Sequence, residues 1–164
     1  MARMEVREAT PADAEAICGI YNPYVANTVI TFERDAVTVD DMAARINNVR
    51  AAYPWLLSVA DGEILGYAYA TRWRTRAAYD FTAETTIYLA PSACRRGIGY
   101  ELYRALLDTL GSSGVHAALG CIALPNEGSV ALHEKCGFRK AGHFPEAGRK
   151  FDRWVDVGFW QILL

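Results

Sequence analysis

The sequence predicts a mixed α/β fold built around one strand–helix–strand unit. Thr82–Leu89 is rich in β-branched and aromatic residues, which is typical of a strand, and Ala117–Leu124 reads as a buried strand. Between them, leucines recur at helical spacing, at Leu102, Leu106, Leu107 and Leu110. Such a unit is expected to cross over right-handed. The length of 164 residues suits a single domain, residues 1–164, around one core.

The chain before this unit is expected to supply one strand and two helices. Residues 4–8 predict the strand. Thr10 and Pro11 provide a cap and a proline at the first helical position, and Pro23 is expected to end that helix, leaving 24–37 as a loop. Thr38 caps a second helix, which runs to about residue 52.

A hairpin is expected next, because Asp61-Gly62 is a strong turn signal between Trp55–Ala60 and a strand over 64–73. Residues 74–80 form a polar loop that leads into the central strand. After the central unit, Asn126 begins a short helix that Gly137 ends. Residues 138–144 and 154–163 are expected to be the closing strands.

Composition and charge argue against several classes of protein. A net charge of −2 disfavours non-specific nucleic-acid binding, and the chain has no apolar run long enough for a membrane span. The first ten residues are charged and lack the apolar segment of a signal peptide. The four cysteines show no CxxC spacing and the three histidines no zinc-ligand spacing. We therefore expect a cytoplasmic protein with reduced thiols and no metal.

The segment between the central strand and its helix has the composition of a phosphate-binding loop. It reads Cys94-Arg95-Arg96-Gly97-Ile98-Gly99. Glycines let backbone N–H groups turn outward together, and the start of the helix adds a partial positive charge. Together with the two arginines, these features predict a site for a phosphate or pyrophosphate.

This loop resembles the pyrophosphate loop of the GNAT acyltransferases, which binds acetyl-coenzyme A and usually reads Gln/Arg-x-x-Gly-x-Gly/Ala. The flanking segments are similar to one branch of that family, the phosphinothricin and methionine-sulfoximine N-acetyltransferases. Cys94 departs from the pattern, because it stands at the first position in place of Gln or Arg. We expect this departure at most to weaken the affinity for the coenzyme, since backbone amides make most of the phosphate contacts in such loops. The matching segments span nearly the whole chain: Tyr21-Asn22, Tyr53-Pro54-Trp55-Leu56, 73–81, 84–88, Leu124-Pro125-Asn126, Leu132-His133-Glu134 and Asp156-Val157-Gly158-Phe159-Trp160.

The resemblance implies a GNAT fold with acetyl-coenzyme A as co-substrate. The pantetheine arm would lie between the diverging strands of the central unit and bond to the backbone at Ile87 and Leu89. Asn126 would contact the pantetheine, or alternatively serve only as a helix cap. The diphosphate would meet the amides of residues 95–100. The full expected set is Ile87, Tyr88, Leu89, Arg95, Arg96, Gly97, Ile98, Gly99, Tyr100 and Asn126.

Glu84 is the expected general base. An acidic residue inside an otherwise apolar strand costs free energy unless something uses or pairs it. Alternation places Glu84, Thr86 and Tyr88 on one face of the strand, and the resembled family has its base at this position. An amine must lose a proton before it attacks a thioester, and a carboxylate can take that proton. The alternative is a structural salt bridge with Arg74 or Arg76.

His133 is the expected second catalytic residue. Many GNAT enzymes have a tyrosine at this position that returns a proton to the departing thiolate, and the resembled branch has histidine. An imidazole titrates in a suitable range for this role. Alternatively, His133 is a hydrogen-bonded structural residue, and Tyr88 or Tyr103 donates the proton.

An anionic acceptor is indicated by Arg72, Arg74 and Arg76, which an extended backbone would place on one side. We assign Arg72 to a solvated strand edge and the other two to the substrate. Ala123 stands where some of the resembled enzymes have glycine, which would narrow the pocket. The full expected set of acceptor contacts is Phe32, Arg74, Arg76, Tyr79, Thr85 and Thr86.

The sequence therefore predicts an enzyme that moves acetyl from acetyl-coenzyme A to the α-amine of a small glutamate-like amino acid, such as phosphinothricin, methionine sulfoximine or methionine sulfone. One alternative keeps the fold but takes another amine, namely a protein N-terminus, a polyamine or an aminoglycoside. The arginine pair disfavours the cationic acceptors. Another is a coenzyme A-binding sensor without transfer, which the presence of Glu84 and His133 disfavours. A homodimer is expected from the resemblance and from several exposed-looking aromatic residues.

Overall fold

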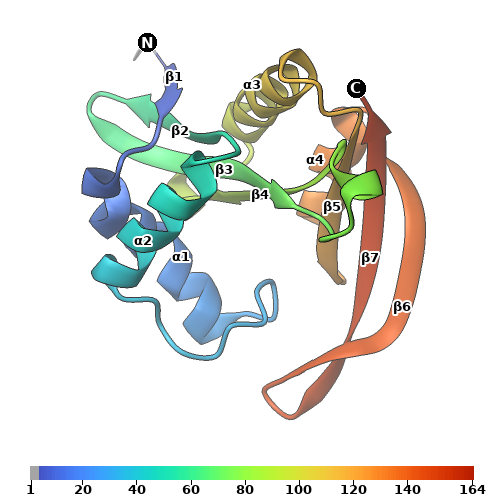
Figure 1. Cartoon of the computed structure of the whole chain (residues 1–164). Coiled ribbons are helices and arrows are strands. Elements are labelled where there is room, and N and C mark those ends of the chain that lie inside the picture. The colour runs from blue at the N-terminus through green and yellow to red at the C-terminus, as the bar shows by residue number, and fades with distance from the viewer. Residues whose placement is uncertain (1–3) are drawn as a thin grey trace.

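The computed structural model describes residues 4–164 and contains a seven-stranded sheet with helices on both faces (Figure 1). The first three residues of the expected domain lie outside the described part. The strands are β1 (Glu5–Glu8), β2 (Trp55–Ala60), β3 (Glu63–Arg72), β4 (Thr82–Leu89), β5 (Ala117–Leu124), β6 (Arg139–Lys150) and β7 (Arg153–Leu163). The helices are α1 (Ala14–Asn27), α2 (Val39–Arg50), α3 (Ile98–Ser112) and α4 (Glu127–Lys135).

The sheet is mixed, which confirms the expected α/β class. Its strand order is β1-β2-β3-β4-β5-β7-β6. Within residues 4–164 only β4 and β5 pair in parallel, and the other neighbours are antiparallel. The two strands of the central unit have the bounds that the sequence predicts, and α3 connects them.

Each face of the sheet has its own apolar core. On one face the leucine stripe of α3, which includes Leu102 and Leu106, packs against Ala68 and Ala118 of the sheet. On the other face α1 and α2 pack against β2 and β3, around Trp55. Burying one such leucine contributes roughly 1.5–3 kcal/mol, so the α3 stripe anchors the helix whose first turn follows the glycine loop.

The prediction that Pro23 ends the first helix is wrong, since α1 continues to Asn27. A proline has no N–H to give to the carbonyl four residues earlier, here Gly19, but both residues are exposed and water can reach that carbonyl. Beyond the proline, Val25 is buried, and the Tyr24 hydroxyl donates to the Leu89 carbonyl at 2.6 Å. Packing of the last helical turn outweighs the local cost of the proline.

The closing hairpin is longer than the sequence predicts. The strand expected over 138–144 is β6, which reaches Lys150 and pairs with β7 almost to the turn. The pairing register shifts between Phe144 and Gly148, and this irregularity accommodates Pro145, which cannot donate to a ladder. The hairpin extends well past the helices in Figure 1.

The two parallel strands separate halfway along their length. Their register runs from Thr82 opposite Ala117 only as far as Thr85 opposite Gly120. Beyond this point β5 continues to pair with β7, whereas residues 86–89 of β4 have no strand partner on the side facing β5. The resulting opening lies at the carboxyl ends of two parallel strands, the usual place for a ligand in an α/β sheet.

None of the helices in residues 4–164 combines the length and the apolar character that crossing a membrane requires.

Candidate active site

Two adjoining cavities occupy the opening between β4 and β5. The smaller, with a volume of about 220 Å³, is called the acceptor pocket here and is lined by Glu84, His133 and the loop at residues 30–32. The larger, called the long groove, has a volume of about 630 Å³ and runs to the glycine loop at Gly97. The cavities meet at five shared residues: Ile30, Ile87, Tyr88, Asn126 and Ser129.

The structure brings Glu84 and His133 into the same pocket from opposite faces of the sheet. Thr85 bonds to Tyr103 of α3, so the alternation of β4 turns Glu84 toward the face covered by α1 and α2. His133 belongs to α4, whose neighbour Leu132 packs against the core on the α3 side. Only the separation of β4 from β5 lets one cavity reach both side chains.

Glu84 lines the acceptor pocket and forms no ion pair in the described part of the chain. Within residues 4–164 it forms no salt bridge with Arg74 or Arg76, so the structural alternative predicted for it is not realised. Burial raises the pKa of its carboxyl group above the ordinary value. The Cys121 thiol also lines this pocket, and burial, with a contribution from the Glu84 charge, raises its pKa to about 11. Cys121 therefore keeps its proton at neutral pH, which leaves Glu84 as the candidate proton acceptor of the two.

His133 is held on both ring nitrogens and is only 4% exposed. Its Nδ1–H donates to the Ser129 carbonyl at 2.7 Å, and Nε2 lies 2.9 Å from the Tyr103 hydroxyl. Burial lowers the pKa of the imidazole, so His133 is neutral at pH 7. Gly120 leaves room for the ring, because a methyl group added there would overlap Nε2. His133 is therefore a hydrogen-bonded structural residue, as one alternative predicted, and it also lines the acceptor pocket.

The two tyrosines considered as alternative proton donors differ in position. Tyr88 lines both cavities. Tyr103 is fully buried and lines neither. Among residues 4–164 its hydroxyl has two hydrogen-bonding partners, His133 and Thr85, the latter at 2.6 Å. Tyr103 can therefore act on the pocket only through His133 or Thr85.

The glycine loop at the end of the long groove has the backbone shape expected of a phosphate cradle. Arg95 and Gly97 have φ of 60° and 83°, and Gly97 immediately precedes α3. The side chains of Arg96 and Ile98 turn away from the groove: Arg96 donates to the Ser92 carbonyl at 3.3 Å, and Ile98 is buried. The expected cofactor residues that do line the groove are Ile87, Tyr88, Leu89, Arg95, Gly97, Gly99, Tyr100 and Asn126.

Two of the residues expected to contact pantetheine already have partners within the protein. The Leu89 carbonyl accepts from the Tyr24 hydroxyl. The Asn126 side-chain oxygen accepts from Ser129 N–H at 3.2 Å, which makes Asn126 the cap of α4 as well as a wall of both cavities. Its side-chain amide group forms no hydrogen bond within residues 4–164 and remains available to a ligand.

The expected acceptor contacts fall into two groups. Phe32, Thr85 and Thr86 line the acceptor pocket, as does Ala123. Arg74, Arg76 and Tyr79 do not, because β3 ends at Arg72 and the chain turns into a loop, so that the three arginines do not continue one strand face. Within this loop the Arg74 guanidinium lies 4.6 Å from the centre of the Trp73 ring.

Several lining residues were not predicted from the sequence. Ile30 and Thr31 precede Phe32 in the same loop, Ser129 follows the helix cap, and Cys121 and Val157 come from β5 and β7. Of these residues only Ser129 could have been predicted from the sequence, because it lies in the first helical turn after Asn126, at the end of the predicted crossover. The others reach the pocket through contacts that are distant in sequence.

The sequence profile described as the acetyltransferase (GNAT) domain matches residues 6–158. The chain belongs to the GNAT acetyltransferases. It is 38% identical over 158 residues to a phosphinothricin N-acetyltransferase of Streptomyces viridochromogenes, covering 96% of this chain and 86% of the other. It is 34% identical over 161 residues to an L-methionine sulfoximine/L-methionine sulfone acetyltransferase of Pseudomonas paraeruginosa, covering 97% and 94%.

A solved GNAT structure has the same architecture. The phosphinothricin acetyltransferase of Sinorhizobium meliloti, determined in complex with AcCoA, matches with a TM-score of 0.94 and 34% identity, covering 98% of this chain and 88% of that one. The family and the fold predicted from the glycine loop and its flanking segments are therefore confirmed, and the chain is an acetyl-CoA-dependent N-acetyltransferase.

The long groove of this GNAT enzyme fits an extended thioester coenzyme. The strand edge at 86–89 offers unpaired backbone groups to an amide-bearing arm. The left-handed turn at Gly97 and the first turn of α3 offer N–H groups to a diphosphate. Gly99 keeps the groove open between them, because a Cβ there would lie 3.0 Å from Leu89 Cδ1 and 3.3 Å from Leu132 Cδ2.

Gly99→Val is expected to weaken acetyl-CoA binding about 5- to 150-fold, since forcing an extra group into a packed site costs about 1–3 kcal/mol. Calorimetric titration measures the effect. Gly111→Val is the matched control, because Gly111 lies in the same helix and a Cβ there would sit at an ordinary 3.6 Å from Leu164. Unchanged coenzyme binding by a folded Gly99→Val protein would remove the groove from the coenzyme site.

Proposed function

We propose that this chain, as one domain over residues 1–164, transfers acetyl from acetyl-CoA to the α-amine of small glutamate-like amino acids such as phosphinothricin, methionine sulfoximine and methionine sulfone. One observation carries the proposal: Glu84, which forms no ion pair with any described residue, lines a small pocket that opens into the coenzyme groove. The names of the similar enzymes from Streptomyces and Pseudomonas support this class of acceptor.

In the proposed reaction Glu84 acts as the general base. Bound acetyl-CoA supplies an acetyl group activated as a thioester. An ammonium group titrating two units above neutral costs roughly 2.7 kcal/mol to deprotonate, at 1.36 kcal/mol per unit. Glu84 takes that proton, directly or through a water molecule, and frees the nitrogen lone pair for attack. Burial raises the pKa of its carboxyl group, which makes the carboxylate a better base than an ordinary one.

We propose that His133 handles the second proton. As the C–N bond forms and the C–S bond breaks, the amine gives up a further proton and the thiolate gains one. His133 is neutral and holds no spare proton at pH 7, so it can only pass on the proton that the amine releases. Ser129 and Tyr103 keep its ring at the pocket wall while it does so.

An anionic acceptor requires cationic contacts, for which the loop before β4 supplies two arginines. Arg72 is bound to Asp80 at 2.5 Å, which fits its assignment to the strand edge. Arg74 and Arg76 form no ion pair within residues 4–164, and both lie in the loop that leads directly into β4, upstream of Glu84. We propose that this loop, with Tyr79, binds the acidic groups of the acceptor, and that Phe32, Thr85 and Thr86 contact it within the pocket.

The proposal is tested by thiol release from acetyl-CoA across a panel of amines. The panel contains phosphinothricin, methionine sulfoximine, methionine sulfone and glutamate, together with an alanine-terminated peptide, spermidine and an aminoglycoside. Turnover of the acidic amino acids is the expected result. If only the peptide or the polyamine is acetylated, the proposed acceptor class is wrong. If the protein binds acetyl-CoA but acetylates no amine, it is a coenzyme A-binding sensor.

We also propose a homodimer, supported by exposed aromatic side chains on the closing hairpin. Phe144, Phe151 and Trp154 are 55%, 58% and 60% exposed. Sedimentation at micromolar concentration is expected to give a species of twice the 18.1 kDa chain mass, and Trp154→Ser is expected to shift it toward the monomer. A wild-type protein that sediments only at 18.1 kDa would contradict the dimer.

A cytoplasmic location is proposed from the state of the thiols. All four cysteines are free, and Cys94 is exposed. Exposed unpaired thiols persist in a reducing compartment.

A further inference from the structure

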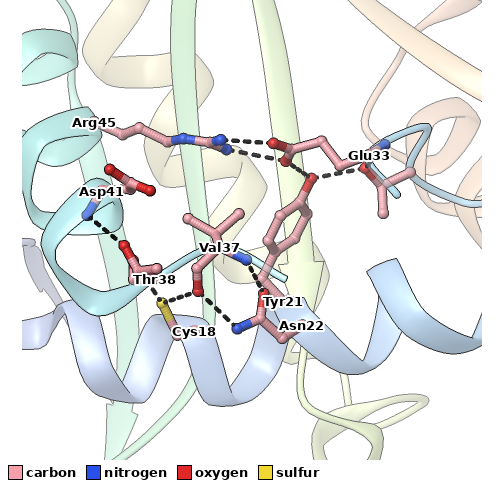
Figure 2. Close-up of polar contacts among 9 residues, drawn as sticks. Cys18, Tyr21, Asn22, Glu33, Val37, Thr38, Asp41 and Arg45 are labelled. Atoms are coloured by element: carbon pink, nitrogen blue, oxygen red, sulfur yellow. Dashed lines mark hydrogen bonds and ion pairs between the residues drawn. The ribbon is translucent and has the colours of Figure 1, made fainter. Parts of the chain in front are cut away.

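One wall of the acceptor pocket is a loop without regular secondary structure. Residues 28–38 connect α1 to α2, and Ile30, Thr31 and Phe32 from this loop line the pocket. No strand or helix fixes their positions, so the shape of the wall depends on side-chain contacts made behind it. These contacts come from α1 and α2 (Figure 2) and also from β6, which supplies Lys150 and Gly148.

A closed ring of hydrogen bonds joins the loop to α1. Burial raises the pKa of Tyr21, so its hydroxyl stays protonated and donates to the Glu33 carboxylate. The Thr31 hydroxyl, 2.7 Å away, must then donate to the Tyr21 oxygen, and it accepts in turn from Glu33 N–H at 3.3 Å. Each polar group of the ring has a partner, which is the condition for a buried network to rigidify its surroundings.

The ring is tied to α2 by a charge pair. The Arg45 guanidinium donates two hydrogen bonds, of 3.0 and 2.6 Å, to the Glu33 carboxylate. Figure 2 shows this bidentate fork beside the Tyr21 hydroxyl. Bidentate arginine–carboxylate pairs fix orientation as well as distance. Neither Tyr21 nor Arg45 lines the acceptor pocket or the long groove, so both act on the wall from outside.

Other anchors hold different parts of the loop. Asn22 exchanges two hydrogen bonds with the backbone of Val37, at 2.9 and 3.0 Å, which fixes the end next to α2. Lys150 of β6 donates to the Thr31 carbonyl at 2.8 Å, which fixes the backbone at one point. The Phe32 ring packs on Gly148 of β6, where an added Cβ would overlap it. The Thr31 side chain and the Glu33 end of this segment are held by the network of Tyr21, Glu33 and Arg45.

We propose that Tyr21, Glu33 and Arg45 are positioning residues that fix the acceptor-side wall of the pocket. This inference rests on the proposed function in one respect, namely that the pocket binds the acceptor. The wall carries the apolar side chains of Ile30 and Phe32, so the network sets where the body of the acceptor lies relative to Glu84. Of this loop only Ile30 also lines the coenzyme groove, most of whose lining comes from the glycine loop, α3 and α4.

The test compares Tyr21→Phe with Tyr67→Phe. Both tyrosines are buried, at 7% and 2% exposure, and both rings pack on Tyr88, with centroids 5.1 and 5.6 Å apart. The Tyr67 hydroxyl forms no hydrogen bond within residues 4–164, whereas the Tyr21 hydroxyl completes the ring. Comparing the two variants therefore distinguishes the effect of breaking the network from the effect of removing any buried tyrosine hydroxyl. Arg45→Met is a second variant, which removes the fork and leaves the buried ring packing untouched.

Two measurements are made on each protein. Amide hydrogen exchange of residues 28–36, measured without substrates, should become faster in Tyr21→Phe and Arg45→Met and stay as in the wild type in Tyr67→Phe. The KM for an acetylated amino acid should rise about 5- to 30-fold in Tyr21→Phe, and less in Arg45→Met, with kcat and the acetyl-CoA dissociation constant largely unchanged.

Unchanged exchange in both network variants would overturn the anchoring role. Faster exchange with an unchanged acceptor KM would overturn the link between the wall and the acceptor. A uniform loss of kcat and of coenzyme binding would indicate general destabilisation and also overturn the proposal. If the wild type acetylates no amino acid, the proposed function fails, whereas the exchange measurement still decides whether these residues fix the wall.

Discussion

Replacing Glu84 by glutamine is expected to lower kcat/KM at neutral pH by about 10²- to 10⁴-fold, the range typical of a positioned acid–base group. Glutamine keeps the size and hydrogen bonding of the side chain but cannot accept the proton of the amine. Acetyl-CoA binding should persist, because Glu84 lines the acceptor pocket and not the long groove. Glu63→Gln, on the exposed end of the neighbouring strand, is the control and should be fully active.

The pH dependence of this loss identifies the group. Burial raises the pKa of Glu84, so as pH falls the wild type should lose its base, and kcat/KM, at a higher pH than an ordinary carboxyl group would allow. In Glu84→Gln this acid limb should be missing, and the deficit should shrink at high pH, where the amine is already neutral. A Glu84→Gln enzyme that remains fully active at neutral pH would place the proton acceptor elsewhere.

Arg74→Ala and Arg76→Ala are each expected to raise the KM for an acidic amino acid about 10- to 150-fold. Each change removes a charge-assisted contact to the substrate, worth about 1.5–3 kcal/mol. Neither guanidinium is committed to another ion pair within residues 4–164, so the loss should appear in substrate binding and not in stability. Raising the pH should not rescue these variants, in contrast to Glu84→Gln.

Arg72→Ala is the matched control for the arginine pair. Arg72 is half-exposed and already bound to Asp80, and exposed pairs contribute little to stability. Its removal should leave the KM near the wild-type value. Arg74 and Arg76 variants that bind methionine sulfone normally would show that the acceptor is held by other groups, since the structure places both arginines outside the pocket itself.

Local sequence signals were sufficient to predict most of the fold. The strands β4 and β5, the leucine stripe of α3 and the cap at Thr38 each follow from neighbouring residues, and the structure has them where the sequence predicts. Pro23 was misread because its cost is local, whereas the packing that outweighs it comes from Val25 and from Leu89 in a distant strand. The length of β6 was underestimated for a similar reason, since pairing with β7 continues past Pro145.

The candidate site was predictable where a motif carries it and hidden where tertiary contacts do. Glu84 stands out as a charge in an apolar strand, and Gly97 stands out in an Arg- and Gly-rich turn. By contrast, the contact of His133 with the backbone of Gly120, or of Glu33 with Arg45, requires knowledge of which segments fold together. The common strand face expected for Arg72, Arg74 and Arg76 is not realised, because β3 ends at Arg72 and the other two arginines lie in the loop that the sequence predicts over 74–80.

The most direct test of the account is identification of the product formed by the wild-type enzyme. Purified protein is incubated with acetyl-CoA and methionine sulfone, and the amino acid is analysed by mass spectrometry and NMR. The account predicts stoichiometric free coenzyme A and one acetyl group on the α-nitrogen, with almost none formed by Glu84→Gln at neutral pH. Unmodified methionine sulfone, phosphinothricin and glutamate from a protein that binds acetyl-CoA would contradict it.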